Sequence, residues 1–264
     1  MTGPWPRCLL VTETIWEAAR AQLADGRTRG NAGGQPRWVL TDLDDADFNG
    51  VYDPVLPSAE ADRGAVLDRV MAPFEAAGRP MAWHLDLART RPWLPSALRA
   101  RGLRYYETEP GLLADPIPDF ESSTVDGLAI VPLPATEDAL RTWAEVYCGE
   151  EGTGQVQRLT RLRLARAAAE EQPTTHLLGF ADGRPVCCAA VFPGTRAALV
   201  ERVVTAEAWR GRGYGTAITR AAMDVALGRG CTRAVLTSSP DGQRIYERLG
   251  FRTECRVTRY LWQP

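Results

Sequence analysis

The sequence predicts an α/β fold, and three observations support this prediction. Between residues 197 and 230, a β-branched run is followed by a glycine-rich turn and then by an amphipathic segment of helical period. Helical and strand-like segments alternate along much of the remaining chain. Asp182-Gly183 joins two apolar runs of strand length, which is a strong hairpin signal. A chain of 264 residues is long for one core and comfortable for two domains.

Composition and charge narrow the class of protein. The formal net charge of −2 argues against a general nucleic-acid binder, which needs a basic field. No apolar run approaches the length of a membrane span, and the first residues lack the plan of a signal peptide. We therefore expect a cytoplasmic protein that binds neither nucleic acid nor membrane.

The six cysteines show neither a disulfide framework nor the spacing of metal ligands. Two of them, Cys187 and Cys188, are adjacent. Small buried apolar side chains in a reducing compartment explain them better than cross-links do. The sequence therefore predicts no metal.

The first 120 residues contain a series of short elements. An apolar start precedes helical spacing over 7–23, so we expect a short strand that turns into a helix. Helical spacing returns over 59–77, with a kink expected at Pro73 and an end at Gly78. The remaining expected elements are strands at 37–41, 81–87 and 103–114, and a helix at 92–101.

Residues 115–124 are rich in proline, serine and acid and have no period, so they are the best linker candidate. They divide the chain into expected domains at 1–120 and 121–264. The expected elements of the second domain, before and after the central stretch, are strands at 128–132, 175–181, 185–192 and 233–237 and helices at 136–146 and 155–171.

One order of elements occurs twice: helix, glycine, strand, proline, helix, glycine, strand. The glycines are Gly230 and Gly250 in the second half and Gly78 and Gly102 in the first. This favours the interpretation of the first half as a degenerate copy of the second, although any α/β half gives similar alternation. The copy has no glycine-rich frame in the corresponding region, 52–64. We therefore expect the chemistry in the second half.

The glycine-rich turn at 210–215 is a candidate phosphate-binding site. Glycines let a ligand approach the backbone, and the first N–H groups of a helix have no internal partner. These donors and the helix dipole favour an anion. The turn lacks the lysine of a nucleotide triphosphatase loop, and Thr216 interrupts the dinucleotide pattern GxGxxG.

The pattern Arg210-x-x-Gly213-x-Gly215, opening a helix after a β-branched strand, resembles the pyrophosphate loop of GNAT-family N-acyltransferases. A second segment, 239–251, resembles another signature of this family, a helix that carries Tyr246 and ends in Leu249-Gly250-Phe251. The two signatures occur in the family's order. The resemblance covers the last half of the chain and implies a mixed, mostly antiparallel sheet flanked by helices, with two such domains in tandem if the first half is a copy.

The resemblance implies coenzyme A as the acyl carrier, with acetyl-CoA or another acyl-CoA as co-substrate. The strand before the loop splays in this family and pairs with the pantetheine arm; here that segment is Val203-Val204-Thr205, and the Val203 N–H would face the developing oxyanion. Ser239 stands where many members carry asparagine, which leaves its coenzyme contact open. The loop residues implied in binding are Arg210, Gly211, Arg212, Gly213, Tyr214, Gly215 and Thr216.

Tyr246 matches the family tyrosine that lies near the thioester sulfur and can protonate the departing thiolate, which needs only modest tuning of its pKa. Packing on the core is its alternative role. A base is also needed, because an alkylamine is cationic at neutral pH. Glu201 lies two residues before Val203, so strand alternation places both on one face; a cross-strand ion pair is the alternative.

Two further positions bear on the acceptor. His176 begins a strand and is a second base candidate, with a structural role as its alternative. Glu150-Glu151 lies between the first two helices of the second half, where the family forms part of its acceptor site. This pair is either an acidic lip that attracts a cationic amine or a solvated loop.

These observations predict an N-acyltransferase that moves an acetyl or other short acyl group from acyl-CoA to a primary amine of a small molecule by direct attack. Two alternatives stay open: a non-catalytic acyl-CoA-binding or regulatory module, and an enzyme that uses the thioester for another acyl chemistry such as hydrolysis. The intact loop and Tyr246 favour the transferase. The oligomeric state is open, a homodimer included.

Overall fold

The computed structural model describes residues 7–23, 28–29, 37–41, 43–52, 56, 60–86, 90–120, 125–149, 153–167 and 174–264. The strands are β1 (Thr28–Arg29), β2 (Arg37–Val39), β3 (Gly50–Tyr52), β4 (Met81–Asp86), β5 (Arg104–Ala114), β6 (Leu128–Pro132), β7 (Thr175–Ala181), β8 (Arg184–Pro193), β9 (Ala198–Thr205), β10 (Ala234–Thr237) and β11 (Arg252–Trp262). The helices are α1 (Arg7–Leu23), α2 (Glu60–Ala77), α3 (Leu94–Arg99), α4 (Glu137–Cys148), α5 (Thr153–Ala167), α6 (Tyr214–Gly228) and α7 (Pro240–Arg248), with short 3-10 helices at η1 (Ala46–Phe48) and η3 (Glu207–Trp209).

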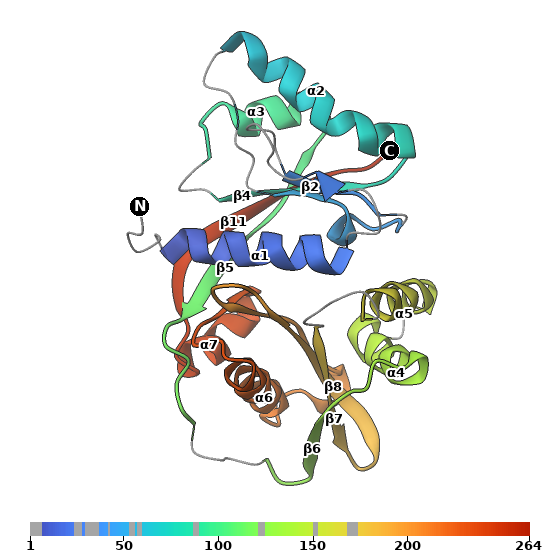
Figure 1. Cartoon of the computed structure of the whole chain (residues 1–264), viewed down its shortest axis with the longest axis vertical. Coiled ribbons are helices and arrows are strands. Elements are labelled where there is room, and N and C mark those ends of the chain that lie inside the picture. Colours follow the sequence, from blue (N-terminus) through green and yellow to red (C-terminus); the bar gives the residue numbers. More distant parts are fainter. Residues whose placement is uncertain are drawn as a thin grey trace.

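All the strands among the described residues belong to one eleven-stranded sheet, in the order β1-β2-β3-β4-β11-β5-β10-β9-β8-β7-β6. Neighbours are antiparallel except for β3 with β4 and β9 with β10, which are parallel. Figure 1 shows α2 and α3 at one end of the molecule, α6 and α7 toward the other, and α1 between them. The expected mixed, mostly antiparallel sheet flanked by helices is confirmed.

The middle of the sheet contains a reciprocal exchange of strands between the two halves, residues 1–120 and 121–264. β5, from the N-terminal half, lies between β11 and β10 and pairs antiparallel with both. β11, from the C-terminal half, lies between β4 and β5. Neither half therefore has a complete sheet without the other. The boundary expected at residue 120 falls shortly after the exchanged strand.

The two halves repeat one series of elements. β3, α2, β4, α3 and β5 are matched in order by β9, α6, β10, α7 and β11. Both helices of each series end at a glycine with positive φ, and the residue after it donates its N–H to a carbonyl five residues back. These bonds are Arg79 to Phe74, Leu103 to Leu98, Cys231 to Ala226, and Phe251 to Tyr246. The repeated helix ends support the interpretation of the first half as a copy.

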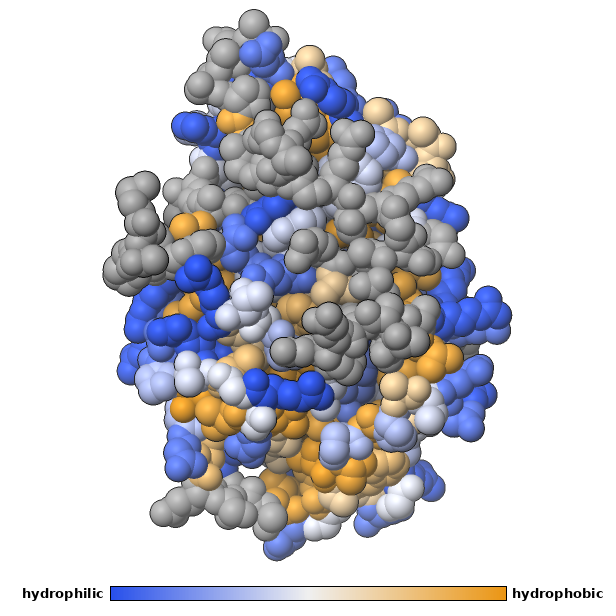
Figure 2. All heavy atoms as spheres, in the orientation of Figure 1, coloured by the Kyte–Doolittle hydropathy of each residue, from blue (hydrophilic) through white to orange (hydrophobic). Residues whose placement is uncertain are grey.

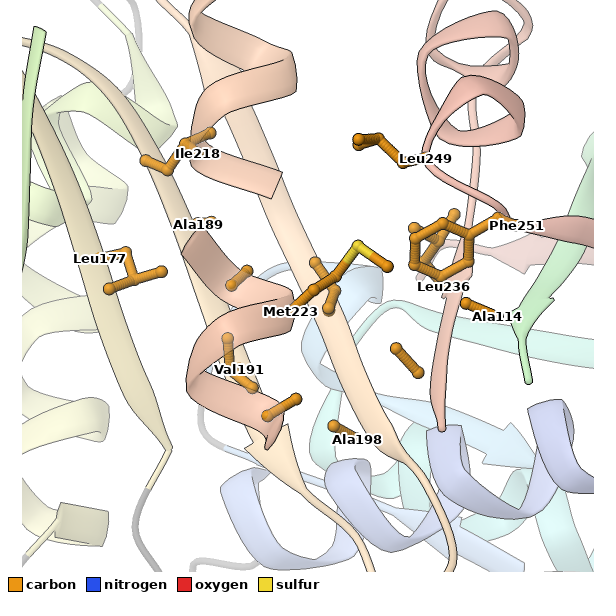
Figure 3. Close-up of a cluster of buried hydrophobic side chains, with 14 of the residues drawn as sticks. Ala114, Leu177, Ala189, Val191, Ala198, Ile218, Met223, Leu236, Leu249 and Phe251 are labelled. Carbon is orange, nitrogen blue, oxygen red and sulfur yellow. The ribbon is translucent and has the colours of Figure 1, made fainter. Parts of the chain in front are cut away.

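Both faces of the sheet are buried under helices. Leu199 and Val200 are adjacent in β9 and point to opposite faces, Leu199 into a cluster with α1 and Val200 into a cluster with α6. The cluster under α6 includes Met223 and Phe251 (Figure 3). α2, α3, α6 and α7 cover one face, and α1, α4 and α5 cover the other. The face under α1 is the one that carries the polar site described below.

Residues 7–23 are helical throughout, so the short strand expected at their start is wrong. The apolar run there includes Leu10 and Val11, which are buried against the sheet as one face of the helix. A short apolar run does not distinguish a strand from a buried helix by its period. The predicted hairpin at Asp182-Gly183 is confirmed between β7 and β8.

The start of the predicted linker is anchored to the C-terminal half. Ile117 is buried and donates its N–H to the carbonyl of Thr232, and Asp115 forms an ion pair with Arg233 at 3.0 Å. Residues 121–124 lie outside the described residues. A segment without periodicity can still be fixed by hydrogen bonds at its ends.

On the face seen in Figure 2, apolar residues gather over the C-terminal half, around the position of α6 in Figure 1, and hydrophilic residues cover the flanks. None of the described helices combines the length and apolar character that crossing a bilayer requires. All six cysteines are free, and Cys187, Cys188 and Cys255 are buried.

Candidate functional site

The glycine-rich turn links η3 to the first turn of α6 and has the backbone of an anion site. Gly211 and Gly213 have φ values of 76° and 82°, which L-residues other than glycine rarely adopt. Residues 210–213 are exposed. The N–H groups of residues 211–216 donate to no backbone acceptor in the described part of the chain. The amides at this helix end are therefore available to a ligand.

The other loop residues frame these amides. Arg210 donates from Nε to the carbonyl of Thr205 at 3.2 Å, and the guanidinium of Arg212 lies 4.8 Å from the ring centre of Trp209. Tyr214 is buried and stacks near Trp209 with 6.2 Å between ring centres. The Tyr214 side chain thus belongs to the packing of the loop, while both arginines leave their charge at the surface.

The strands β9 and β10 separate directly before this loop. Only Ala198 and Leu199 pair with β10, although β9 continues to Thr205. Leu236 and Thr237 of β10 stay paired with β5 on the other edge of β10, but they have no partner in β9. One edge of the segment Val203-Val204-Thr205 is consequently not bonded to a strand on that side, as the family resemblance implied. This is the gap in which an extended ligand arm can add to a strand edge.

A bulge in β9 changes which side chains share a face. Arg202 has φ 55°, and the register with β8 shifts so that Glu201 faces Ala190 while Val204 faces Cys188. Glu201 therefore shares its face with Val204, and Val203 packs in the cluster under α6. The expectation that Glu201 and Val203 share a face is wrong, because the extra residue of a bulge interrupts the alternation.

A cavity of about 300 Å³ lies on the α1 side of the sheet, beside the β9–β10 gap. Its floor includes Leu199 and Glu201 of β9 and Thr237 of β10, and α1 and α4 form parts of its wall. Both halves contribute to it: the N-terminal half supplies Asp47, Tyr52, His84 and Glu109, and the C-terminal half supplies Tyr147, Arg202 and Arg259 as well.

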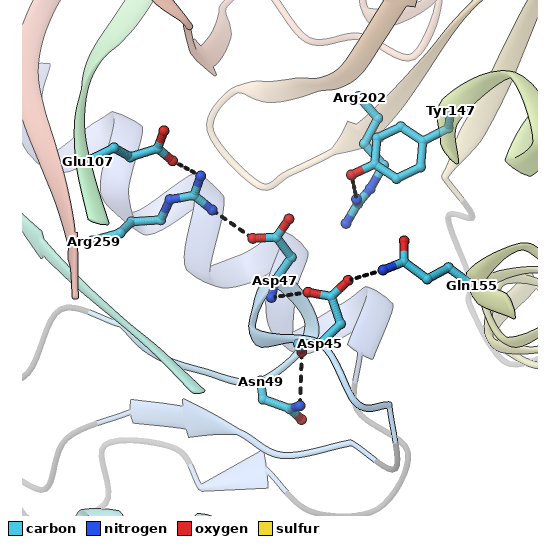
Figure 4. Close-up of polar contacts among 8 residues, drawn as sticks. All are labelled: Asp45, Asp47, Asn49, Glu107, Tyr147, Gln155, Arg202 and Arg259. Carbon is cyan, nitrogen blue, oxygen red and sulfur yellow. Dashed lines mark hydrogen bonds and ion pairs between the residues drawn. The ribbon is translucent and has the colours of Figure 1, made fainter. Parts of the chain in front are cut away.

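Two polar networks contribute side chains to the lining of this cavity, and Figure 4 shows their contacts. Arg259 donates to Asp47 at 2.7 Å and also bonds Glu107. Arg202 donates to the phenol oxygen of Tyr147 at 2.8 Å. Most charges that line the cavity are therefore already paired with a protein group. The same figure shows Asp45, which bonds Gln155 at 3.2 Å and so links η1 to α5.

Glu201 lies in the cavity but between two guanidinium groups. Its Oε1 is 3.7 Å from Nη2 of Arg163, and its Oε2 is 3.8 Å from Nε of Arg202. The ion-pair alternative thus describes its surroundings, with partners from α5 and from β9 itself rather than from the neighbouring strand. Its role as the base stays a prediction.

Glu109 is a carboxylate of the cavity that the sequence analysis did not single out. Among the described residues it has no ion pair; its hydrogen-bond partner is the hydroxyl of Thr237. Burial raises the pKa of Glu109, and Asp47 raises it further, while Thr237 opposes the shift. The signal in the sequence is the pair Glu107 and Glu109, two acids on one face of an otherwise uncharged strand end.

Tyr246 projects from α7 and packs against Phe251, with 6.0 Å between ring centres. Burial raises the pKa of Tyr246 to about 12, and the nearby Glu109 carboxylate contributes. The phenol is therefore a stable hydrogen-bond donor. Because a free thiol has a pKa of about 8.5, full proton transfer from Tyr246 to a thiolate is unfavourable. The modest tuning expected of Tyr246 requires a lower pKa, and its surroundings raise the pKa instead.

Ser239 caps α7, because its Oγ accepts the N–H of Gly242 at 3.3 Å. The serine thus has a structural partner, and its contact with a coenzyme stays a prediction. Gly242 lies under the tyrosine: a Cβ at this position would come within 2.9 Å of the Tyr246 ring. The close approach of the ring to the helix backbone depends on this glycine.

Both histidines of the chain are neutral at physiological pH. Burial, followed by nearby arginines, lowers the pKa of His176 to about 3, and burial with Arg259 does the same for His84. His176 packs edge-on against Trp143 and is not among the described residues that line the cavity. This environment makes His176 a poor base. Glu150 and Glu151, the expected acidic lip, lie outside the described residues.

The class of the C-terminal half follows from a family comparison. Residues 138–251 match the model of the Acetyltransferase (GNAT) family. The match contains the splayed strand pair, the glycine-rich loop and the helix that carries Tyr246. This segment is therefore a GNAT domain, and the resemblance stated from the two signatures is confirmed. No group of three or more His, Cys, Asp or Glu suited to a metal occurs among the described residues.

Solved structures share the fold over nearly the whole chain. A GCN5-related N-acetyltransferase from Kribbella flavida is 21% identical with a TM-score of 0.71, over 99% of this chain and 97% of that one. A tandem GNAT protein from the clavulanic acid biosynthesis pathway is 16% identical with a TM-score of 0.63, over 94% and 87%. A functionally unknown conserved protein from Staphylococcus epidermidis is 10% identical with a TM-score of 0.65, over 90% and 94%. At such identities the likeness establishes the fold. No curated protein sequence matches the chain.

Proposed function

We propose that this protein is an acyl-CoA-dependent N-acyltransferase that acylates a primary amine of a small molecule. One observation carries the proposal: the unbonded amides at the start of α6 lie directly after a strand pair that separates, and a polar cavity adjoins the gap between the strands. A two-substrate acyl transfer needs three parts: a helix start that binds an anion, an unpaired strand edge for the carrier, and a separate cavity for the acceptor.

The residues of the loop fit a coenzyme diphosphate. The proposal assigns the N–H groups at Gly211, Gly213, Gly215 and Thr216 to it, with Arg210 and Arg212 as exposed cations. A carboxylate or other blocking group is absent from residues 210–216. A Cβ at Gly211 would meet no atom within 4 Å, so the backbone there is open, whereas one at Gly215 would contact Thr205 at 3.6 Å.

A bound acyl-CoA would supply the thioester whose C–S bond breaks as the C–N bond of the product forms. In the proposal, the edge of Val203-Val204-Thr205 orients the carrier, and the Val203 N–H stabilises the oxyanion. Tyr246 donates a hydrogen bond to the departing sulfur. Its raised pKa keeps the donor proton in place over the whole physiological range.

The cavity is proposed as the chamber of the amine. Its volume of about 300 Å³ suits a small molecule, at the lower end of ordinary ligand pockets. Three of the charged side chains that line it are carboxylates and two are guanidinium groups, so its balance favours a cation. The proposal includes a cytoplasmic location, where acyl-CoA is available and free cysteines such as these stay reduced.

The test is a thiol-release assay with acetyl-CoA and a panel of small primary amines, followed by mass analysis of the products. Release that depends on the amine, with acylated amine as product, is the expected result. Tight coenzyme binding without release on any amine would instead favour a non-catalytic binding module. Release accompanied by free acid would indicate hydrolysis.

A further inference from the structure

The position of Glu109 follows from the strand exchange. β5 comes from the N-terminal half, and its residue Glu109 faces Val257 of β11 in the sheet register. Glu107, two residues earlier, faces Arg259, which lines the cavity. Residues two apart on a strand share a face, so Glu109 points to the cavity side together with these groups.

Resting on the proposed transferase function, we propose that Glu109 is a catalytic residue that binds the ammonium group of the acceptor and removes the proton that must leave before the nitrogen attacks. The ligand class is a small primary alkylamine, cationic in solution, with its charged end at Glu109. The N-terminal half then contributes a reacting group to the active site of the GNAT domain.

The charge balance of the cavity selects Glu109 from its three carboxylates. Asp47 is bonded to Arg259 at 2.7 Å. Glu201 lies within 4 Å of both Arg163 and Arg202. Glu109 has a neutral partner, Thr237, and no ion pair among the described residues. Even a half-buried carboxylate without a cation carries a desolvation cost, and a cationic ligand relieves that cost.

Glu109 also lies near Tyr246, the residue proposed to donate a hydrogen bond to the leaving sulfur. Thr237, its hydrogen-bond partner, is the last residue of β10, just before the turn into α7. The Glu109 carboxylate is close enough to raise the pKa of the Tyr246 phenol. An acceptor nitrogen bound at Glu109 would thus lie beside the β9–β10 gap and near Tyr246.

The atoms and charges balance along this path. The ammonium group gives one proton to the Glu109 carboxylate and becomes a neutral amine. Its nitrogen forms the C–N bond as the C–S bond breaks, and the second proton passes from the nitrogen to the sulfur, which Tyr246 holds by a hydrogen bond. Glu109 then returns its proton to water. The products are an amide, a free thiol and one proton.

The test compares Glu109→Gln, Glu201→Gln and the wild-type enzyme with two sets of acceptors: primary alkylamines, and aromatic amines that are already neutral at neutral pH. For alkylamines, Glu109→Gln is expected to lower kcat/KM by about 10²-fold or more. For aromatic amines the loss is expected to be several-fold at most, because no proton has to be removed before attack. Glu109→Asp is expected to recover part of the activity.

Two controls keep the outcome clear. Glu254→Gln removes an acid of β11 that pairs with Arg7 at 3.1 Å away from the cavity, and it is expected to leave both rates unchanged. Coenzyme affinity is expected to be equal in all variants. Because the pKa of Glu109 is raised, its ionised form opposes folding at neutral pH, so Glu109→Gln should melt no lower than the wild type there.

The outcomes separate the two proposals. If the wild type acylates alkylamines and Glu109→Gln does so equally well, or loses activity equally for both sets of acceptors, the role of Glu109 as the base is overturned. A selective loss of alkylamine turnover in Glu201→Gln alone would move that role to Glu201. If the wild type releases no thiol with any amine, the transferase function fails and the role of Glu109 with it.

Discussion

The two parallel strand–helix–strand units of this chain share a fold and differ at the junction between their parallel strands. In the C-terminal unit, β9 and β10 pair over two residues and then separate. In the N-terminal unit, all three residues of β3 pair with β4. Tyr52, the last residue of β3, stacks on His84 of β4 with 4.5 Å between ring centres and an interplanar angle of 12°. Side chains close the junction in one unit, and the other leaves it open.

The helices that follow these strands, α6 and α2, also differ at their N-termini. α6 begins after Gly211 and Gly213, with unbonded amides and two exposed arginines. α2 begins at residue 60 and carries Asp62 in its first turn. Carboxylates at a helix N-terminus satisfy the dipole and repel a phosphate. The two units thus keep one fold while the features that favour an anion differ, because such features depend on a few backbone amides and charges.

The contrast between the two units depends on coenzyme binding at the loop before α6, and one substitution tests this binding. Gly213→Glu is expected to abolish coenzyme binding, since it adds a negative charge at the amides and a side chain at φ 82°. Calorimetric titration with coenzyme A measures this, with one site per wild-type chain expected. Gly230→Glu, at φ 81° beyond the other end of α6, is the matched control for backbone strain. Binding that survives in Gly213→Glu, or two sites per chain, would refute the comparison.

The tyrosine of α7 is the next difference between the units. Its counterpart by the shared helix end is the buried Leu98 of α3. Tyr246→Phe removes a hydrogen bond to a charged leaving group and is expected to lower kcat by about 10- to 100-fold at unchanged coenzyme affinity. Tyr105→Phe, an exposed tyrosine of β5, is the control. Unchanged turnover in Tyr246→Phe would assign the role to water or another group.

The closed junction of the N-terminal unit, where Tyr52 stacks on His84, can be tested by measuring stability as the pH is lowered. The pKa of His84 is about 3 in the folded protein, below the ordinary value near 6.5, so its contribution to stability is present above pH 6.5 and is lost as pH falls toward 3. His84→Gln should therefore flatten the fall in unfolding free energy between pH 6.5 and pH 4.5 by roughly 2–3 kcal/mol. With two histidines in the chain, NMR titration can follow each. A His84 that titrates near pH 6.5 would mean an open junction.

Substitutions at two glycines test the packing of the exchanged strand β5. A Cβ at Gly111 of β5 would meet Sγ of Cys255 at 2.5 Å and Val11 at 3.0 Å, so Gly111→Ala is expected to destabilise the protein by about 1–3 kcal/mol. Gly64→Ala, in α2 with its nearest atom at 3.5 Å, should stabilise it by about 0.5–1 kcal/mol. Chemical denaturation measures both. Two effects of the same sign would contradict the packing of β5 against β11 and α1.

Local residue chemistry accounted for the loop and most of the elements. Alternating glycines before an amphipathic helix have few other uses, and the helix ends at Gly78 and Gly230 are short-range signals. The helix at 7–23 was partly missed, because its apolar start has no period that separates a buried helix from a strand. The face of Glu201 was also wrong, since the bulge at Arg202 arises from packing against β8 and has no clear local signal.

The sequence by itself determined the class of fold, the glycine-rich loop and the helix with Tyr246, because each depends on residues close together in the chain. Only the tertiary structure decided which acids line the cavity. Glu109 and Thr237 are far apart in sequence and become neighbours because β5 enters the sheet of the other half. Strand pairing over such distances is set by the burial of whole faces, which no local pattern encodes.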